Sequence, residues 1–149
     1  MPTDIRIDPF RGFNFRVEID GLPVAAFSEV GGLTAEGDPV DYREGTDLKN
    51  SVRKLPALRK YAMLSCKRGY VQDDTLWRWY QRIANGENDR RNGSIVLMNE
   101  AHRDVMRWNF ENGWINKIEG PSLNASGNEV AIEAMEICHE ALTFELETA

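Results

Sequence analysis

Strict alternation of apolar and polar residues between positions 13 and 20 is the feature that most constrains what this chain can fold into. The alternating residues are Phe13, Asn14, Phe15, Arg16, Val17, Glu18, Ile19 and Asp20. Because successive side chains of a strand point to opposite faces, a period of two predicts a half-buried β-strand. Asp20-Gly21 is a turn dipeptide, so we expect residues 22–30 to return as the second strand of a hairpin.

Later segments continue the β pattern. We expect further strands over residues 37–44, 60–69, 95–98, 106–110, 114–119 and 142–146. Residues 129–140 fit two alternatives. Four Glu residues would line one side of a helix, whereas a strand explains the apolar alternation if a bulge shifts it by one position.

A single amphipathic helix is expected after residue 73. Its apolar residues recur at helical spacing, and they are Leu76, Trp79, Tyr80 and Ile83. Asp73 suits the cap of this helix, and Asn85-Gly86 suits its end. About eight strands and one helix predict a mainly β (α+β) fold. Two antiparallel sheets would form a β-sandwich or barrel with one flanking α-helix and a long inter-strand loop.

The totals restrict the classes of function. A chain of 149 residues suits a single domain, 1–149, and its net charge of −6 argues against a general nucleic-acid binder or a protein that docks on anionic lipid. No apolar run approaches the ~20 residues of a membrane span, so no direct membrane anchor is expected. The N-terminus lacks the apolar segment of a signal peptide, which predicts synthesis in the cytoplasm.

Catalytic chemistry is not indicated by any group of residues. Of the two histidines, His102 stands in a predicted polar hairpin turn and His139 stands beside Glu140 where a strand ends, so neither is expected to be catalytic. Cys66 and Cys138 stand far apart and are expected to be free thiols. No cluster has zinc or calcium spacing, and no glycine loop suits a phosphate. We therefore expect no enzyme, no cofactor and no metal.

The segment 45–57 is a long polar excursion for a compact domain. Three basic residues, Arg53, Lys54 and Arg59, stand close together at its end and just beyond it. Loops of this length are usually functional or disordered. Strands with one apolar face also leave edges that need covering, which an oligomer provides. Both features favour an assembly protein.

Several stretches, in order, resemble the phage tail tube proteins of contractile tails. They are Asp8–Gly21, Phe27–Leu33 with the sequence Phe-Ser-Glu-Val-Gly-Gly-Leu, Val40–Gly45, Val52–Leu58 with Val-Arg-Lys-Leu-Pro-Ala-Leu, Leu64–Gly69, Trp108–Trp114, Glu119–Ala125 and Asn128–Glu140. Together they cover roughly residues 8–146. The resemblance is strongest to inner-tube proteins of contractile injection systems, which are phage-tail-like particles. It implies a strand at 129–140 and a kink within a strand at Asn112-Gly113.

The resemblance implies a structural role. Such proteins form hexameric rings that stack into a hollow tube, which the sheath drives forward when it contracts. The expected partners are other copies of the chain, the sheath protein, baseplate or hub and tube-terminator proteins, and effector cargo in the lumen. The particle would be extracellular or cell-bound. The resemblance also implies that residues 1–12 form an N-terminal arm and that the loop 45–57 reaches the adjacent ring.

Two sets of contact residues follow from the resemblance. The inter-ring or inter-subunit set is Arg43, Glu44, Asn50, Arg53, Lys54, Leu55, Pro56 and Arg59. The candidate sheath-facing set is Trp77, Arg78, Glu87, Asp89 and Arg90. Two alternatives stay open: a tube-initiating, baseplate-proximal paralogue with the same fold, and a monomeric β-domain that binds a ligand or peptide.

Overall fold

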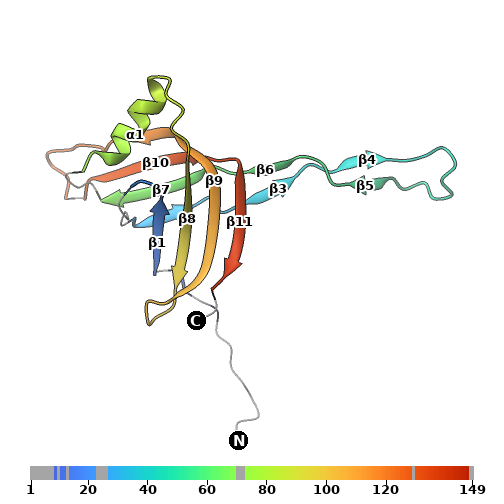
Figure 1. Ribbon diagram of the computed structural model, residues 1–149, viewed down its shortest axis with the longest axis horizontal. Coiled ribbons are helices and arrows are strands. Elements are labelled where there is room, and N and C mark those ends of the chain that lie inside the picture. Colours follow the sequence, from blue (N-terminus) through green and yellow to red (C-terminus); the bar gives the residue numbers. More distant parts are fainter. Residues whose placement is uncertain are drawn as a thin grey trace, which may run out of the picture.

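A computed structural model describes residues 9, 11–12, 14–22, 27–69, 73–128 and 130–147, and the N-terminal arm predicted at 1–12 lies mostly outside this part. Within it, the chain forms eleven strands and one helix (Figure 1). The strands are β1 (Phe15–Ile19), β2 (Glu29–Gly31), β3 (Ala35–Gly37), β4 (Val40–Tyr42), β5 (Arg53–Leu55), β6 (Arg59–Tyr61), β7 (Leu64–Gly69), β8 (Arg91–Met98), β9 (Asp104–Glu119), β10 (Ile132–Cys138) and β11 (Ala141–Leu146). The helix is α1 (Thr75–Ala84).

Seven strands form one hydrogen-bonded network that β9 divides into two sheets. Sheet 1 contains β1, β8, the first part of β9 and β11, in that order. Sheet 2 contains the last part of β9, β10, β7 and β2, in that order. All pairs are antiparallel, which confirms the predicted mainly β fold with a flanking helix. The described strands do not close into a barrel within one chain.

The long strand β9 passes from one sheet to the other at Asn112. Its backbone has a φ of 54° there, a left-handed conformation that Asn tolerates better than most residues. The Asn112 amide group donates to Glu140, which lies between β10 and β11. The strand β9 and the connection from β10 to β11 therefore pass from one sheet to the other side by side, joined by this hydrogen bond. The predicted kink within a strand at Asn112-Gly113 is confirmed.

The core draws on both sheets and the helix. Its most buried members are Val17, Ile19, Leu64, Cys66, Leu76, Trp79, Ile95, Phe110, Ile115, Met135 and Ile137. Leu76 and Trp79 belong to the predicted apolar stripe of α1, and Tyr80 and Ile83 pack against the core beside them. At the start of the helix, the Asp73 carboxylate accepts from the Thr75 backbone N–H at 3.1 Å. The predicted helix, its apolar stripe and its end at Asn85-Gly86 are thus confirmed, but its N-cap is Asp74 rather than Asp73.

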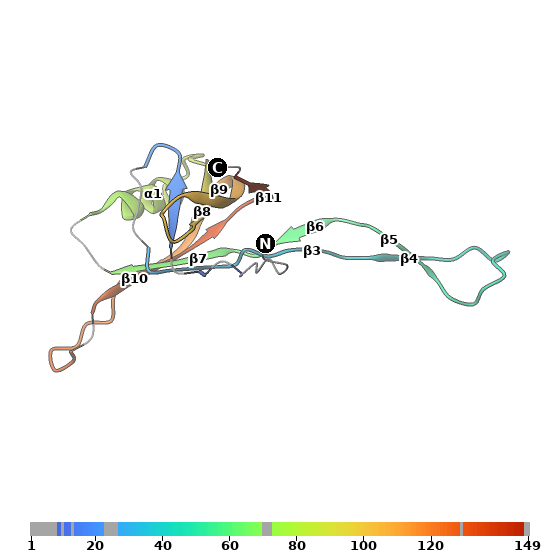
Figure 2. The same cartoon turned by 90° about the horizontal axis from the view of Figure 1, so that it is seen from below.

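Four short strands form an arm that projects from the body. β3 pairs with β6 and β4 pairs with β5, so residues 35–61 make a narrow two-stranded ribbon that continues β2 and β7 outward (Figures 1 and 2). The predicted loop 45–57 is the outer part of this arm. It is not a loop throughout, because Arg53–Leu55 pair with β4.

Three local predictions are wrong. Residues 13–20 do not form a hairpin with 22–30, since β1 pairs with β8 and β2 pairs with β7. Residues 60–69 are not one strand, because the chain breaks between β6 and β7. The bulge expected in 129–140 is a register shift that places the extra residue, Asn116, on β9.

Candidate interaction surface

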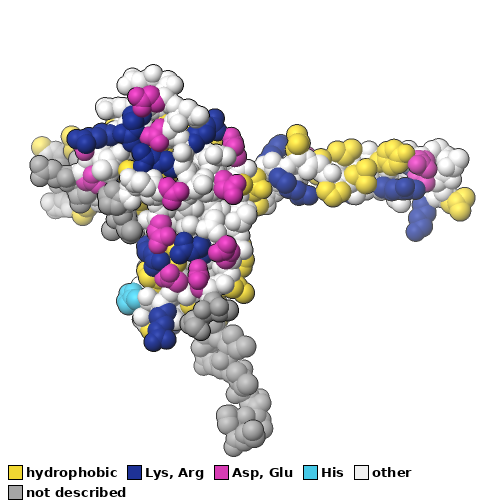
Figure 3. Space-filling view, viewed as in Figure 1, with side chains coloured by type: hydrophobic (Ala, Val, Ile, Leu, Met, Phe, Trp, Pro, Cys, Tyr) yellow, Lys and Arg dark blue, Asp and Glu magenta, His cyan; other side chains and the backbone are white. Residues whose placement is uncertain are grey.

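The arm exposes apolar side chains that nothing in the described chain covers. Every residue of β4 and β5 is exposed. The apolar residues among the exposed ones are Val40, Tyr42, Leu48, Val52, Leu55 and Leu58. Figure 3 shows hydrophobic side chains along the length of the arm, with Lys and Arg side chains among them. Apolar side chains gathered this way on a thin ribbon are typical of a surface that packs against another molecule.

The two faces of the ribbon differ. Val40 lies opposite Leu55, and the next pair along is Asp41 with Lys54. Because side chains alternate along a strand, the first pair occupies one face and the second pair the other. The first face therefore carries Val40 and Leu55, followed by Tyr42 opposite Arg53, whereas the other face carries an ion pair between the Lys54 ammonium and the Asp41 carboxylate. We call the first one the apolar face of the arm.

Cross-strand ion pairs take the place of a core in the arm. Arg53 bonds to Asp47 at 2.9 Å and Lys60 to Asp38 at 2.7 Å, in addition to the pair at Lys54. In each pair the carboxylate comes from the outgoing half and the cation from the returning half. Exposed pairs of this kind each contribute little. The arm is therefore extended but only weakly stabilised by its own contacts.

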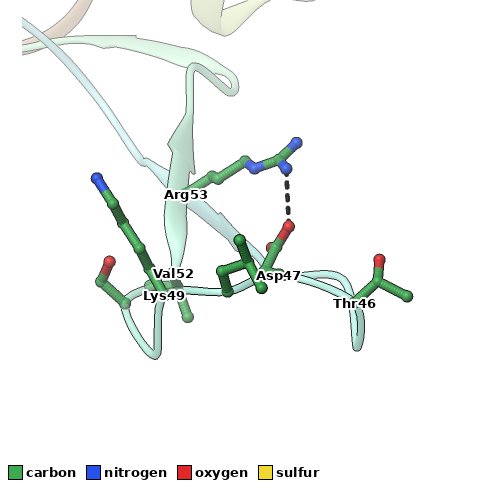
Figure 4. A pocket seen from close by; sticks show the side chains of 7 residues that line it. Thr46, Asp47, Lys49, Val52 and Arg53 are labelled. Carbon is green, nitrogen blue, oxygen red and sulfur yellow. Dashed lines mark hydrogen bonds and ion pairs between the residues drawn. The ribbon is translucent and has the colours of Figure 1, made fainter.

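The tip of the arm is a curled loop. Thr46, Asp47, Leu48, Lys49, Ser51, Val52 and Arg53 line an open hollow of about 360 Å³. Figure 4 shows Arg53 and Asp47 pointing toward each other beside it, joined by their ion pair. The Arg43 guanidinium also donates to the backbone oxygens of Asp47 and Lys49. These contacts give the tip a defined shape without burying any of its apolar residues.

The root of the arm is anchored in the body. The buried imidazole of His139 lies with its two nitrogens 3.0 Å from the carbonyl oxygens of Ala62 and Ala141, and its ring packs against Tyr61. Gly32 has a φ of 88°, and a Cβ at this position would overlap the Met63 carbonyl oxygen. The arm therefore leaves the body at a close backbone crossing held by a buried side chain.

All eight residues of the predicted inter-ring set lie on the arm. They are Arg43, Glu44, Asn50, Arg53, Lys54, Leu55, Pro56 and Arg59, and each is exposed. Sequence reasoning missed the apolar residues Val40 and Tyr42, which share a face with Leu55. The alternation of Val40 and Tyr42 with Asp41 predicts a strand, but it does not show that this strand lies outside the body.

The predicted sheath-facing residues lie on and beside α1, and most of their charges are paired within the chain. Arg78 bonds to Asp74 and Arg90 to Glu140. Trp77 is half-buried and meets Tyr80 edge to face, while Glu87 is exposed.

Asp89 has a structural role in the body. Its carboxylate accepts from Arg91 and Arg82, and these hydrogen bonds lower its pKa. Its backbone oxygen accepts from the Trp79 indole at 2.8 Å. The side chain therefore holds the helix to the start of β8.

Two features of the described residues concern metal binding and nucleophilic chemistry. No group of three or more His, Cys, Asp or Glu side chains among them is placed to hold a metal ion. Burial raises the pKa of Cys66 to about 12, which keeps this thiol from acting as a nucleophile at neutral pH. Within this part of the chain, no helix is long and apolar enough to cross a membrane.

Comparison with known proteins identifies the fold and the family. The model of the family described as T4-like virus tail tube protein gp19 matches residues 11–143. The chain belongs to this family. The arm is thus a feature of a tail tube protein, and the residues named above are parts of a tube subunit. No curated protein matches the sequence.

Solved structures share the tail tube fold over nearly the whole chain. A chain of the sheath–tube complex of the PVC extracellular contractile injection system, in its extended state, has a TM-score of 0.83 at 21% identity, with 93% of each chain covered. A chain of the anti-feeding prophage tube-terminating cap has a TM-score of 0.85 at 24% identity, covering 97% of this chain and 96% of that one. Hcp1 from Flavobacterium johnsoniae is more distant, with a TM-score of 0.55 at 11% identity over 89% and 95%.

Proposed function

We propose that this tail tube protein is a structural subunit of the inner tube of a contractile, phage-tail-like injection system, and not an enzyme. Six copies would close a ring, and stacked rings would form the tube through which cargo is delivered when the sheath contracts. The observation that carries this proposal is the arm. No part of the chain that the structure describes covers its apolar face, and another copy would provide this cover.

Free sheet edges support closure into a ring. Sheet 1 ends at β1 and β11, and sheet 2 ends at β2 and the last part of β9. In each sheet the two edge strands run in opposite directions, because all neighbouring pairs are antiparallel. A second copy can therefore continue either sheet by antiparallel pairing. Ring closure would remove edges that otherwise invite uncontrolled aggregation.

The remaining partners follow from the relatives. The similar structures come from a sheath–tube complex, a tube-terminating cap and a baseplate. We infer that this chain contacts a sheath protein on its outside, with Trp77, Arg78, Glu87 and Arg90 on the candidate surface, and baseplate and terminator proteins at the tube ends. The subunit would be made in the cytoplasm and act in an extracellular or cell-bound particle.

A second candidate function is that of a tube-initiating or tube-ending paralogue. The cap structure matches as well as the sheath–tube complex does, and a baseplate chain has a TM-score of 0.81. The number of copies per particle separates the two. A main tube protein occurs in many rings, whereas an initiator or cap occurs in one.

The test compares the two faces of the arm. Val40→Ser with Leu55→Ser removes the aliphatic pair of the apolar face, and the matched control Asp41→Ser with Lys54→Ser changes the other face at the neighbouring register. Electron microscopy of the concentrated protein should show rings and stacked tubes for the wild type and the control, but unstacked rings for the first variant. Stacking by both variants would contradict the proposed role of the arm. A monomeric wild type, even with baseplate proteins from the same gene cluster, would favour a β-domain binding module.

A further inference from the structure

The chain contains three Asn-Gly dipeptides, and their surroundings differ. They are Asn85-Gly86, Asn92-Gly93 and Asn112-Gly113. In such a dipeptide the glycine nitrogen can attack the side chain of the asparagine before it, because glycine has no Cβ to block the approach and leaves the backbone free to rotate. Folded structure opposes this attack wherever hydrogen bonds hold the side chain or packing fixes the glycine. The three dipeptides can therefore be ranked by their contacts.

Two of the dipeptides are fixed within the body. The Asn92 side-chain oxygen accepts from the Asn112 backbone N–H at 3.0 Å, and the Asn112 side-chain amide donates to a neighbouring carboxylate. Gly93 and Gly113 are buried members of the β8–β9 pair. A Cβ at either glycine would overlap the Phe110 ring, so neither backbone has room to rotate. Both asparagines are therefore protected.

The dipeptide Asn85-Gly86 at the end of α1 is open. Both residues are exposed, and a Cβ at Gly86 would meet no atom within 4 Å. The Asn85 side chain forms no hydrogen bond with a described residue. One contact opposes the attack, because the Gly86 N–H donates to the Ile83 carbonyl oxygen at 3.1 Å. This bond lies in the exposed last turn of a helix, where ends fray, so it opens far more often than a bond within the β8–β9 ladder.

We propose that Asn85 is a site of spontaneous deamidation. The Gly86 nitrogen forms a bond to Cγ of Asn85, the bond between Cγ and Nδ2 breaks, and ammonia leaves with the proton that the Gly86 amide loses. Solvent water then opens the cyclic imide at either of its carbonyl carbons and gives aspartate or isoaspartate. Nothing is oxidised or reduced, and water is the only other reactant.

The product changes the end of α1 in two ways. A new negative charge stands at the carboxyl end of the helix, where the helix dipole already places partial negative charge. Isoaspartate also adds a methylene to the backbone, which disturbs the bonds from Gly86 to Ile83 and from Glu87 to Arg82. Both changes loosen the last turn of α1. This chemistry does not depend on the proposed stacking of rings, so a failure of one leaves the other standing.

Peptide mapping by mass spectrometry tests the site on the full-length chain. The protein is incubated at mildly alkaline pH in heavy-oxygen water, once folded and once unfolded in guanidinium chloride. The unfolded chain should convert all three asparagines at similar rates. In the folded chain Asn85 should convert at least about tenfold faster than Asn92 and Asn112, because their strands open more rarely. Conversion of Asn92 or Asn112 as fast as Asn85 in the folded chain would overturn the proposal, as would an Asn85 rate suppressed as strongly as theirs.

Native isoelectric focusing gives a second readout with two variants. Aged wild-type protein should gain a more acidic band at the position of fresh Asn85→Asp. Asn85→Gln keeps a side-chain amide but would have to form a larger ring, so it should gain far less of this band. If Asn85→Gln becomes acidic as fast as the wild type, the new charge arises at another residue and the proposal fails.

Discussion

The body and the arm are both β structures, but they differ in how much of their apolar surface is buried. In the body, side chains such as Leu64 and Ile137 are fully buried between two sheets and a helix. In the arm, both strands of the β4–β5 pair are exposed along their length, and apolar residues point to solvent. The body therefore carries its stabilising contacts within one chain, whereas the described residues supply few such contacts to the arm.

This difference separates stability from assembly. Changes in the body should lower the free energy of unfolding of each subunit. Changes in the arm should leave that free energy nearly unchanged and alter the contacts between subunits. Four predictions test the comparison.

The largest loss of stability is expected at the helix–sheet contact. Trp79 is fully buried, donates to the Asp89 carbonyl oxygen and lies under the Arg91 guanidinium. Trp79→Ala should lower the free energy of unfolding by about 5 kcal/mol, near the upper end for a large aromatic residue. Urea denaturation followed by circular dichroism measures this. The half-buried Trp77→Ala serves as the control, and an equal loss there would show that α1 does not pack as described.

The next largest effect is expected at a buried ion pair. The Arg68 guanidinium bonds to Glu133 at 2.8 Å, and both side chains are nearly inaccessible to solvent. Arg68→Met leaves the carboxylate buried without its partner, so we expect a loss of about 3 kcal/mol. Adding Glu133→Leu should restore most of it, because no buried charge remains. If the double variant is less stable than Arg68→Met, the pair is not the reason for the loss.

Acid should weaken sheet 1 through the Arg16–Asp104 pair. Two hydrogen bonds of 2.6 and 2.7 Å from Arg16 lower the pKa of Asp104. A carboxylate with a lowered folded-state pKa contributes stability above its unfolded pKa of about 4, and this is lost as the pH falls through the folded-state value.

The measurement is unfolding stability between about pH 2 and pH 6. Asp104→Asn should be less stable than the wild type at pH 6 by about 1 kcal/mol, and the two should converge in acid. Glu145→Gln removes a carboxylate that forms no ion pair with a described residue, so its curve should follow the wild type more closely. Parallel curves for Asp104→Asn and wild type would argue against the pair.

Sequence patterns predicted which segments are strands better than which strands pair. The alternation at 13–20 specifies which side chains of β1 face the core, and Val17 and Ile19 are indeed buried. It does not specify a partner, and β1 pairs with β8, so that Phe15 lies opposite Leu97. The local pattern of residues does not encode a pairing between segments so far apart in the sequence. The turn dipeptide Asp20-Gly21 instead predicts a hairpin that does not form.

The buried Glu133 explains the misplaced bulge. Glu133, Met135, Ile137 and His139 all face inward, so the alternation of β10 never slips. A charged residue at a core position hides this regularity, because its partner Arg68 lies in another strand. Ile132 directly precedes Glu133 and therefore lies on the outward face of β10. The sequence predicts the arm as an excursion, but its strands of three residues are too short for an alternation to identify them as a paired ribbon.

The smallest effect is expected within the arm, where the comparison with the body is sharpest. The Lys54–Asp41 pair is more than half exposed on both sides, so Asp41→Ala should cost about 0.5 kcal/mol locally. Because β4 and β5 touch no part of the core, this loss should appear as an exchange rate about twofold faster for their backbone amides and not as a change in the melting temperature of the body. Hydrogen exchange measured residue by residue distinguishes the two. A cooperative loss that reaches β7 or β10 would mean that the arm and the body unfold as one unit, and the separation between stability and assembly would then fail.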